Sequence, residues 1–240
     1  MSKPRVGILG AGRLGKALAL SLRGSCDLAI FDLRSRLTKQ FAKQNGLSFL
    51  CEEDLFSSCD FLILCIPPDE TEKVVLRLDR RDSGVTMVLN TATGTHTSRI
   101  VHNLGLRRIK LIGLKPIGQF TAIELGVKVV FVTEHSDVTD LRFLSEVFSD
   151  IGVIRRGDER VVQALNREAT RLALEFGGTF LESVQSITTD LEWALSALRG
   201  CVAGTILDYP PDPENSYTSA LLKEMNGEHA FSVNPIEEER

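Results

Sequence analysis

A run of glycines near the start of the chain could bind a phosphate group through its backbone. Gly10, Gly12 and Gly15 have the spacing GxGxxG, follow an apolar run and open an amphipathic stretch. In such a loop the first glycine makes a tight turn, the second leaves room for a pyrophosphate, and the third lets a helix approach a strand. The N–H groups of Arg13 and Leu14, at the start of that helix, would face the phosphates. The spacing predicts a dinucleotide-binding loop; an incidental glycine turn is the alternative.

An acidic residue ends the next predicted strand, twenty positions after Gly12. Asp32 is placed to accept hydrogen bonds from the hydroxyls of an adenosine ribose and to repel a 2′-phosphate. Arg34, with Ser35 and Arg36 in the same loop, could instead pair with a 2′-phosphate, or lie on a solvated loop. The cofactor is therefore expected to be NAD or NADP, and Asp32 favours NAD.

The elements that must position this loop alternate along the first two thirds of the chain. Short β-branched apolar runs alternate with amphipathic stretches, a pattern typical of βαβ units. We predict an α/β fold of the Rossmann type, with a doubly wound, mostly parallel sheet. Predicted strands cover residues 6–9, 28–31, 61–66, 86–89, 110–112, 127–132 and 152–154, and predicted helices cover 14–22, 37–44, 70–78, 97–104 and 138–150.

The pattern changes near Asp158, after which apolar residues recur at helical spacing and no strand pattern follows. We expect a dinucleotide-binding domain over residues 1–157, a small all-helical domain for substrate binding or dimerisation over 158–226, with a short helix at 217–225, and a flexible tail over 227–240. A segment this small does not easily form a core alone, so its apolar stripe should pack on the sheet domain or on a second copy. A homodimer is expected. The stripe comprises Val161, Leu165, Ala169, Leu172, Phe176, Phe180 and Val184.

Composition excludes several other classes of protein. With 28 basic and 32 acidic residues, the net charge of −4 gives no general attraction to nucleic acid or to an anionic membrane. No apolar run approaches the roughly 18 residues that cross a bilayer. The five cysteines are odd in number and contain no CxxC pair, which indicates reduced thiols rather than a disulfide framework or a metal site. We expect a cytoplasmic protein whose partner is a small-molecule substrate.

Four segments match those of a known group of reductases. These are VGILGAGRLGKALALSL, LILCIPPDETEKVV, VLNTATG, and VFVTE followed by a helix and DIG. Over residues 5 to about 160 the chain resembles the N-terminal domain of the pyrroline-5-carboxylate reductase and coenzyme F420-dependent NADP reductase group. The resemblance implies that Cys65, Ile66 and Pro67 contact the cofactor, and that the strand before Asn90 and Thr91 ends close to the nicotinamide.

The resemblance also implies an activity. We expect an NAD(P)-dependent oxidoreductase that reduces a C=N or C=O bond of a small, carboxylated metabolite. Pyrroline-5-carboxylate reductases carry GSGPA and TSPGGTT motifs after the dinucleotide domain, where this chain has Leu-Asn-Arg-Glu-Ala at 165–169 and Val-Ala-Gly-Thr at 202–205. These departures leave open an alternative, a non-catalytic dinucleotide-binding regulatory or scaffold protein.

Three polar residues are candidates for the chemistry of hydride transfer. Lys115, in a Lys-Pro-Ile segment where the reductases carry Met-Pro-Asn and the related prephenate dehydrogenases His-Pro-Met, could bind a substrate carboxylate or donate a proton, or be a surface lysine at a turn. His96, after the strand that ends near Asn90, is a candidate proton donor. Asn166 could face the nicotinamide, or lie on a solvated face. The lack of a clear acid–base pair favours an imine, since an iminium already carries the charge that hydride neutralises.

Overall fold

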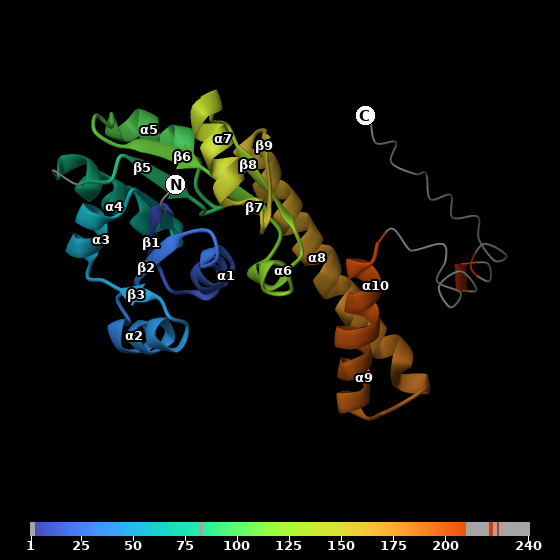
Figure 1. Ribbon diagram of the computed structural model, residues 1–240. Coiled ribbons are helices and arrows are strands. Elements are labelled where there is room, and N and C mark those ends of the chain that lie inside the picture. Colours follow the sequence, from blue (N-terminus) through green and yellow to red (C-terminus); the bar gives the residue numbers. More distant parts are fainter. Residues whose placement is uncertain (1–2, 82–83, 210–220, 223–224, 226–240) are drawn as a thin grey trace. The chain divides into compact units, whose positions relative to one another are not determined.

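The computed structural model describes residues 3–81, 84–209, 221–222 and 225 (Figure 1). The chain divides into two compact units, Met1–Ala169 and Thr170–Arg240. The first contains every described strand, whereas the described residues of the second form helices and the short connections between them. The long helix α8, Glu159–Ser183, begins in the first unit and ends in the second.

The main sheet of the first unit has six strands in the order β3-β2-β1-β4-β5-β6, and every neighbouring pair is parallel. Its strands are β1 (Arg5–Leu9), β2 (Asp27–Phe31), β3 (Ser48–Phe49), β4 (Phe61–Leu64), β5 (Met87–Asn90) and β6 (Lys110–Gly113). The chain runs outward from β1 to β3, then crosses back to β4 on the other side of β1. This reversal is the switch point at which open α/β sheets bind ligands. The predicted doubly wound fold is confirmed.

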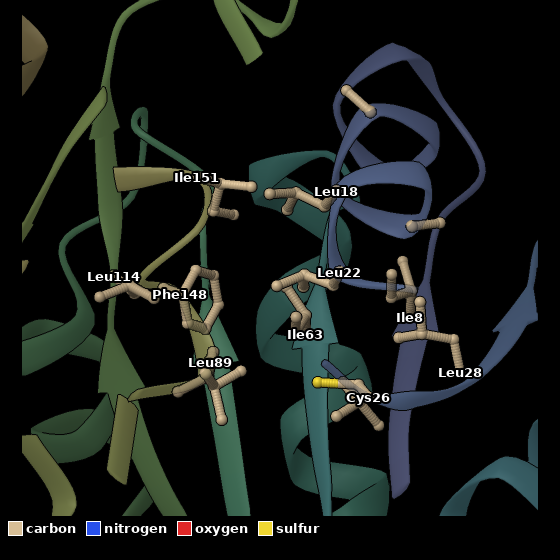
Figure 2. Close-up of a cluster of buried hydrophobic side chains, with 14 of the residues drawn as sticks. Ile8, Leu18, Leu22, Cys26, Leu28, Ile63, Leu89, Leu114, Phe148 and Ile151 are labelled. Atoms are coloured by element: carbon tan, nitrogen blue, oxygen red, sulfur yellow. The ribbon is translucent and has the colours of Figure 1, made fainter. Parts of the chain in front are cut away.

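Helices cover both faces of this sheet. They are α1 (Arg13–Leu22), α2 (Ser35–Gln44), α3 (Glu52–Ser58), α4 (Pro68–Arg80), α5 (Thr97–Leu104), α6 (Phe120–Glu124) and α7 (Val138–Val147). Figure 2 shows one core, where Leu18 and Leu22 of α1 lie with Ile63 of β4. On the other face Val75 of α4 belongs to a second core with Leu62. Successive strand residues point to opposite faces, so both faces need apolar side chains, which explains the unbroken apolar runs in the sequence.

A second, smaller sheet completes the first unit. It has the order β7-β8-β9, formed by β7 (Lys115–Ile117), β8 (Val129–Thr133) and β9 (Gly152–Arg156). The strand β7 is antiparallel to β8, and β8 is parallel to β9. The predicted strands at 127–132 and 152–154 therefore exist, but they belong to this second sheet. The elements β3, α3, β7 and α6 are not predicted from the sequence, because segments this short do not complete a recognisable period of apolar residues.

The second unit contains the remainder of α8, the turn η1 (Val184–Ser186), α9 (Leu191–Ala197), the π-helical η2 (Leu198–Val202) and α10 (Ala203–Leu207). The expected small helical C-terminal segment is thus present. Apolar side chains on it are exposed in the single chain: Phe176 is 50% exposed and Trp193 is 70% exposed. The predicted tail at 227–240 and most of the predicted helix at 217–225 lie outside the described residues. Within the described part of the chain, no helix has the length and apolar character needed to cross a membrane.

Candidate functional site

The glycine loop joins β1 to α1 at the switch point. Gly10 has φ +105°, and a Cβ there would lie 2.3 Å from the carbonyl oxygen of Cys65. A Cβ at Gly15 would lie 1.9 Å from the carbonyl oxygen of Gly10. These two glycines therefore let the loop pack against the rest of the protein. A Cβ at Gly12 would meet nothing within 4 Å, so the space beside it is open, as binding of a pyrophosphate requires.

The start of α1 is suited to an anion. Gly12 is the N-cap residue and has no side chain with which to cap the helix. The first N–H groups of a helix have no partner within the helix, and they carry the positive end of its dipole. The N–H groups of Arg13, Leu14 and Gly15, all in this first turn, therefore fit a phosphate group. The Arg13 guanidinium lies over the Phe120 ring of α6, 5.2 Å from its centroid, and Figure 1 shows α6 beside α1.

Asp32 lies against the same loop. Its Oδ2 accepts a hydrogen bond from the Ala11 N–H at 2.8 Å, and its Oδ1 accepts from the Arg34 N–H at 2.8 Å and Nε at 3.3 Å. Burial by itself would raise the pKa of Asp32, but the donors of Arg34 and Ala11 together lower it below its ordinary value. The carboxylate is therefore ionised at the edge of the glycine loop, directly after β2.

A pocket of about 360 Å³ opens beside Asp32 at the carboxyl ends of β1 and β2. Its walls are largely apolar and its rim carries charges of both signs. It brings together the predicted residues Gly10, Asp32, Arg34, Ile66 and Pro67. The lining comprises Leu9, Gly10, Phe31, Asp32, Leu33, Arg34, Glu52, Ile66, Pro67, Glu70, Val74 and Arg77. An apolar pocket with a few oriented polar groups, next to a phosphate-binding loop, fits the adenosine half of a dinucleotide.

Two charged residues of this rim were not predicted from the sequence. Arg77 of α4 pairs with Glu52 of α3 at 2.5 Å, and both line the pocket. One signal for Arg77 was present in the sequence: Glu70, Val74 and Arg77 recur at helical spacing on one face of α4. Glu52 had no such signal, because α3 is too short to be recognised from its pattern.

The ends of β4 and β5 lie next to each other in the sheet. Thr91 donates a hydrogen bond through Oγ1 to the carbonyl oxygen of Leu64 at 2.7 Å and lies 3.7 Å from the Cys65 sulfur. Burial raises the pKa of the Cys65 thiol to about 12, so this residue is a neutral packing group rather than a nucleophile. Asn90 is fully buried; its Nδ2 donates to Thr97 Oγ1 at 3.0 Å and its Oδ1 accepts from the Ala92 N–H at 3.1 Å.

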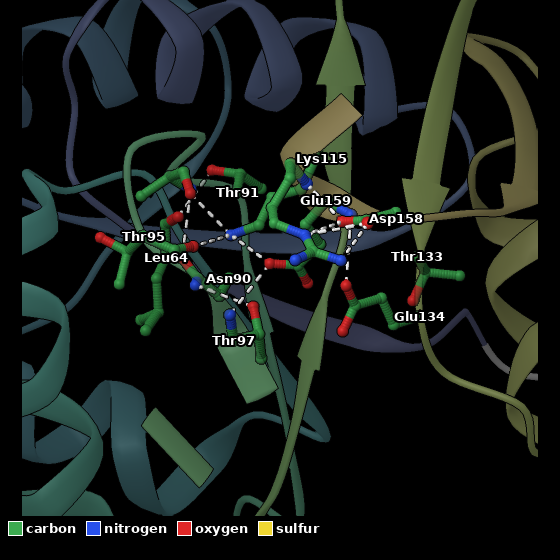
Figure 3. Close-up of polar contacts among 12 residues, drawn as sticks. Leu64, Asn90, Thr91, Thr95, Thr97, Lys115, Thr133, Glu134, Asp158 and Glu159 are labelled. Carbon is green, nitrogen blue, oxygen red and sulfur yellow. Dashed lines mark hydrogen bonds and ion pairs between the residues drawn. The ribbon is translucent and has the colours of Figure 1, made fainter. Parts of the chain in front are cut away.

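Lys115 is inside the protein rather than at a surface turn. Its side chain is 0% exposed, and its Nζ donates to the carbonyl oxygens of Ala92 at 2.6 Å and Thr95 at 3.0 Å (Figure 3). It also lies 3.6 Å from Oε2 of Glu159, which is 3% exposed and accepts a hydrogen bond from the Thr97 N–H at 2.9 Å. Burial lowers the pKa of Lys115 to about 8, although Glu159 opposes this shift. The amine is fully engaged by these groups.

The other two candidates occupy different places. Asn166 of α8 accepts a hydrogen bond from the Gly118 N–H through Oδ1 and donates to the Pro116 carbonyl oxygen through Nδ2, both at 2.9 Å. It therefore holds the end of β7. His96 is the half-buried N-cap residue of α5. Asn90 and Lys115 thus share one network, whereas Asn166 contacts the backbone beyond Lys115.

The lowered pKa of Lys115 predicts a pH dependence of stability. Below about pH 8 the lysine is protonated in both states, so its contribution is constant. Between about 8 and its ordinary value of 10.5 the unfolded chain binds a proton that the folded protein has released, so stability rises with pH. In urea titrations across this range, the wild type should gain stability relative to Lys115→Met. If the difference in unfolding free energy between wild type and Lys115→Met stays constant, or shifts in favour of the variant as the pH rises, the pKa of Lys115 is not lowered.

Comparisons with known proteins agree with this fold. Residues 5–94 match the model of the family described as NADP oxidoreductase, coenzyme F420-dependent. A comparison with curated proteins finds no match. At the identities given below, the similarity to solved structures shows a shared fold.

Three solved structures illustrate that fold. Pyrroline carboxylate reductase of Plasmodium falciparum with NADP bound is 15% identical, with a TM-score of 0.66 over 96% of this chain and 92% of that chain. 1-Pyrroline-5-carboxylate reductase of Streptococcus pyogenes is 16% identical, with a TM-score of 0.68 over 95% and 92%. An imine reductase variant of Myxococcus stipitatus in complex with NAD⁺ is 15% identical, with a TM-score of 0.55 over 95% and 88%. The predicted resemblance to this group is confirmed. Residues 5–94 are therefore similar to the coenzyme F420-dependent NADP oxidoreductase family, and the chain has a fold shared with pyrroline-5-carboxylate and imine reductases.

Proposed function

We propose that this protein is an NAD(P)-dependent oxidoreductase that reduces a C=N or C=O bond of a small, carboxylated metabolite. The observation that carries the proposal is the open space beside Gly12, at the start of α1, next to an apolar pocket edged by the Asp32 carboxylate. The reduced cofactor, when bound, supplies the hydride. The protein binds and orients it and keeps water from the reacting atoms.

The residues around the loop have separate roles in this proposal. The N–H groups of Arg13 and Leu14 bind the pyrophosphate, Asp32 accepts from the ribose hydroxyls, and Ile66 and Pro67 form the pocket wall. On the adjacent strand ends, Cys65, Asn90 and Thr91 shape the nicotinamide side. The ionised Asp32 and its pairing with Arg34 support NAD rather than NADP, because a 2′-phosphate would have to displace that ion pair.

The candidate residues for the chemical step support reduction of an imine. Lys115 and Asn166 have their polar side-chain atoms on backbone groups, which supports roles in holding the backbone rather than in proton transfer. His96 remains the candidate proton donor for a ketone substrate. An iminium needs no such donor, because the hydride neutralises a charge that is already present.

Assembly and cellular setting complete the proposal. The exposed apolar residues of α8 and α9, among them Leu172, Phe176 and Trp193, support a homodimer in which a second copy covers this helical segment. We place the functional domain boundary near residue 157, before α8, although the compact units divide within α8 at residue 169; the helical part after this boundary would serve dimerisation and substrate binding. The five cysteines are free thiols, which supports a cytoplasmic protein.

The direct test is binding followed by turnover. Fluorescence titration with NADH and NADPH should show saturable binding of at least one of them. The bound cofactor should then be oxidised by a member of a panel of carboxylated cyclic imines and 2-oxo acids. Failure to bind either cofactor would contradict the proposal. Binding with no turnover across the panel would favour the alternative, a regulatory or scaffold protein. The hydrogen bonds of Lys115 and Asn166 to backbone groups would then explain why no turnover occurs.

Asp32→Asn tests the basis of cofactor choice. The substitution removes the charge but keeps an oxygen for the Ala11 N–H. We expect about tenfold weaker binding of NADH, since a hydrogen bond to a charged acceptor contributes roughly 1.5 kcal/mol, and no loss of NADPH binding. Asp60→Asn is the matched control, because Asp60 also accepts a backbone N–H, from Arg5 at 2.8 Å, but does not line the pocket. Equal affinities in wild type and Asp32→Asn would show that Asp32 does not contact the ribose.

A further inference from the structure

The loop between β5 and α5, residues 91–96, lies at the carboxyl edge of the main sheet. In the strand order, β5 is next to β4, and β4 is next to β1, which carries the glycine loop. The adenosine pocket is lined by the ends of β1 and β2 and by the segment that follows β4, and residues 87–96 are not part of its lining. A dinucleotide crosses the sheet at the switch point, so its second half must extend from the glycine loop toward β4 and β5. Under the proposed function, residues 91–96 therefore border the nicotinamide.

Buried side chains hold this loop at several points. The Thr91 hydroxyl is bonded to the Leu64 carbonyl oxygen, and the Ala92 N–H to Asn90. The single amine of Lys115 binds two carbonyl oxygens of the loop, those of Ala92 and Thr95. The N–H that follows the loop, at Thr97, donates to Glu159. Figure 3 shows these side chains converging on the loop.

The amine and the carboxylate come from outside the main sheet. Lys115 begins β7 of the second sheet, and Glu159 begins α8. The Glu159 carboxylate lies against Gly113, the last residue of β6. A Cβ at Gly113 would lie 1.5 Å from Oε1 of Glu159, so only a glycine leaves room for the carboxylate here. A buried ion pair is weak evidence for stability, because apolar side chains of similar size are often as stable. The pair therefore calls for an explanation other than stability.

We propose that Lys115 and Glu159 are positioning residues that hold the 91–96 loop in the conformation that accepts the nicotinamide half of the cofactor. The inference rests on the proposed function, and it assigns the pair a role that is separable from adenosine binding. Neither side chain touches the cofactor in this proposal. Lys115 fixes the two loop carbonyl groups, and Glu159 fixes both Lys115 and the start of α5.

The test compares two ligands on the same protein. ADP-ribose contains the adenosine and pyrophosphate but lacks the nicotinamide, so the ratio of NADH to ADP-ribose affinity reports the nicotinamide side alone. If the wild type prefers NADPH, the two ligands compared are NADPH and 2′-phospho-ADP-ribose. Calorimetry on the double variant Lys115→Met/Glu159→Gln, which leaves no unpaired charge, should show NADH affinity reduced about tenfold or more and ADP-ribose affinity within about twofold of wild type.

Lys110→Met is the matched control, because Lys110 is a half-exposed lysine on β6 paired with Asp140 at 2.6 Å. It should leave both affinities unchanged. An unchanged NADH to ADP-ribose ratio in the double variant would overturn the inference. A wild type that binds neither ligand would instead overturn the proposed function, so the two failures are distinguishable.

A second measurement needs no variant. In hydrogen exchange on the wild type, NADH should protect the Ala92 and Thr97 N–H groups more than saturating ADP-ribose does, because only NADH carries the group that the loop accepts. Equal protection by the two ligands would also overturn the inference.

Discussion

Replacing Gly12 by valine is expected to abolish binding of NADH and NADPH, with at least about a hundredfold loss of affinity, while the protein stays folded. The Gly12 backbone, at φ −70° and ψ −170°, is open to any residue, and a Cβ there would meet nothing within 4 Å. The valine side chain would instead fill the space through which a pyrophosphate must reach the N–H groups of α1. Loss of the glycine N-cap should cost no more than about 1 kcal/mol of unfolding free energy.

Gly15→Ala is the complementary variant. Its Cβ would lie 1.9 Å from the Gly10 carbonyl oxygen, so the loop and α1 must move apart. We expect a loss of unfolding free energy of about 3 kcal/mol, in the range of overpacked sites. Fluorescence titration and urea denaturation of both variants separate the effects on binding and on folding. Retention of cofactor binding by Gly12→Val would contradict the assignment of this loop to the pyrophosphate.

Replacing Lys115 by methionine is expected to lower the unfolding free energy by about 3–5 kcal/mol. The substitution leaves the buried Glu159 carboxylate without its cation and removes the donor from the carbonyl oxygens of Ala92 and Thr95. Adding Glu159→Gln should restore part of the loss, because the buried charge is then gone. The partial recovery would identify the unpaired carboxylate, rather than the lost hydrogen bonds alone, as a main cause.

Lys110→Met is the control for this prediction too, and should cost no more than about 1 kcal/mol, as a surface ion pair does. Far-UV circular dichroism is the appropriate probe of urea unfolding, because the only tryptophan, Trp193, belongs to the second unit. Equal losses for Lys115→Met and Lys110→Met would show that the buried pair carries no special energetic weight.

Local chemistry made the cofactor loop predictable. Gly10, Gly12 and Gly15 are each needed for the local backbone conformation or close packing of the loop. The position of Asp32 at the end of the next strand is set by the length of one strand–helix–strand unit. The apolar runs predicted the parallel sheet for a similar reason, since strands covered by helices on both faces must be apolar at nearly every position. These features depend on neighbours along the chain, so their spacing is visible in the sequence.

The contacts among the buried charged residues of the site could not be predicted, because they depend on tertiary packing. Nothing in the sequence near Lys115 indicates that the chain reverses there into a second sheet, that its amine binds the loop after β5, or that Glu159 is its partner. Glu52 of α3 and Arg77 of α4 likewise meet only because the fold brings both to the pocket rim. The sequence by itself determined the dinucleotide fold and the glycine loop. Only the tertiary structure decided which charges are buried and paired, because these pairings join distant segments, and the free energy of a buried charge depends on every group around it.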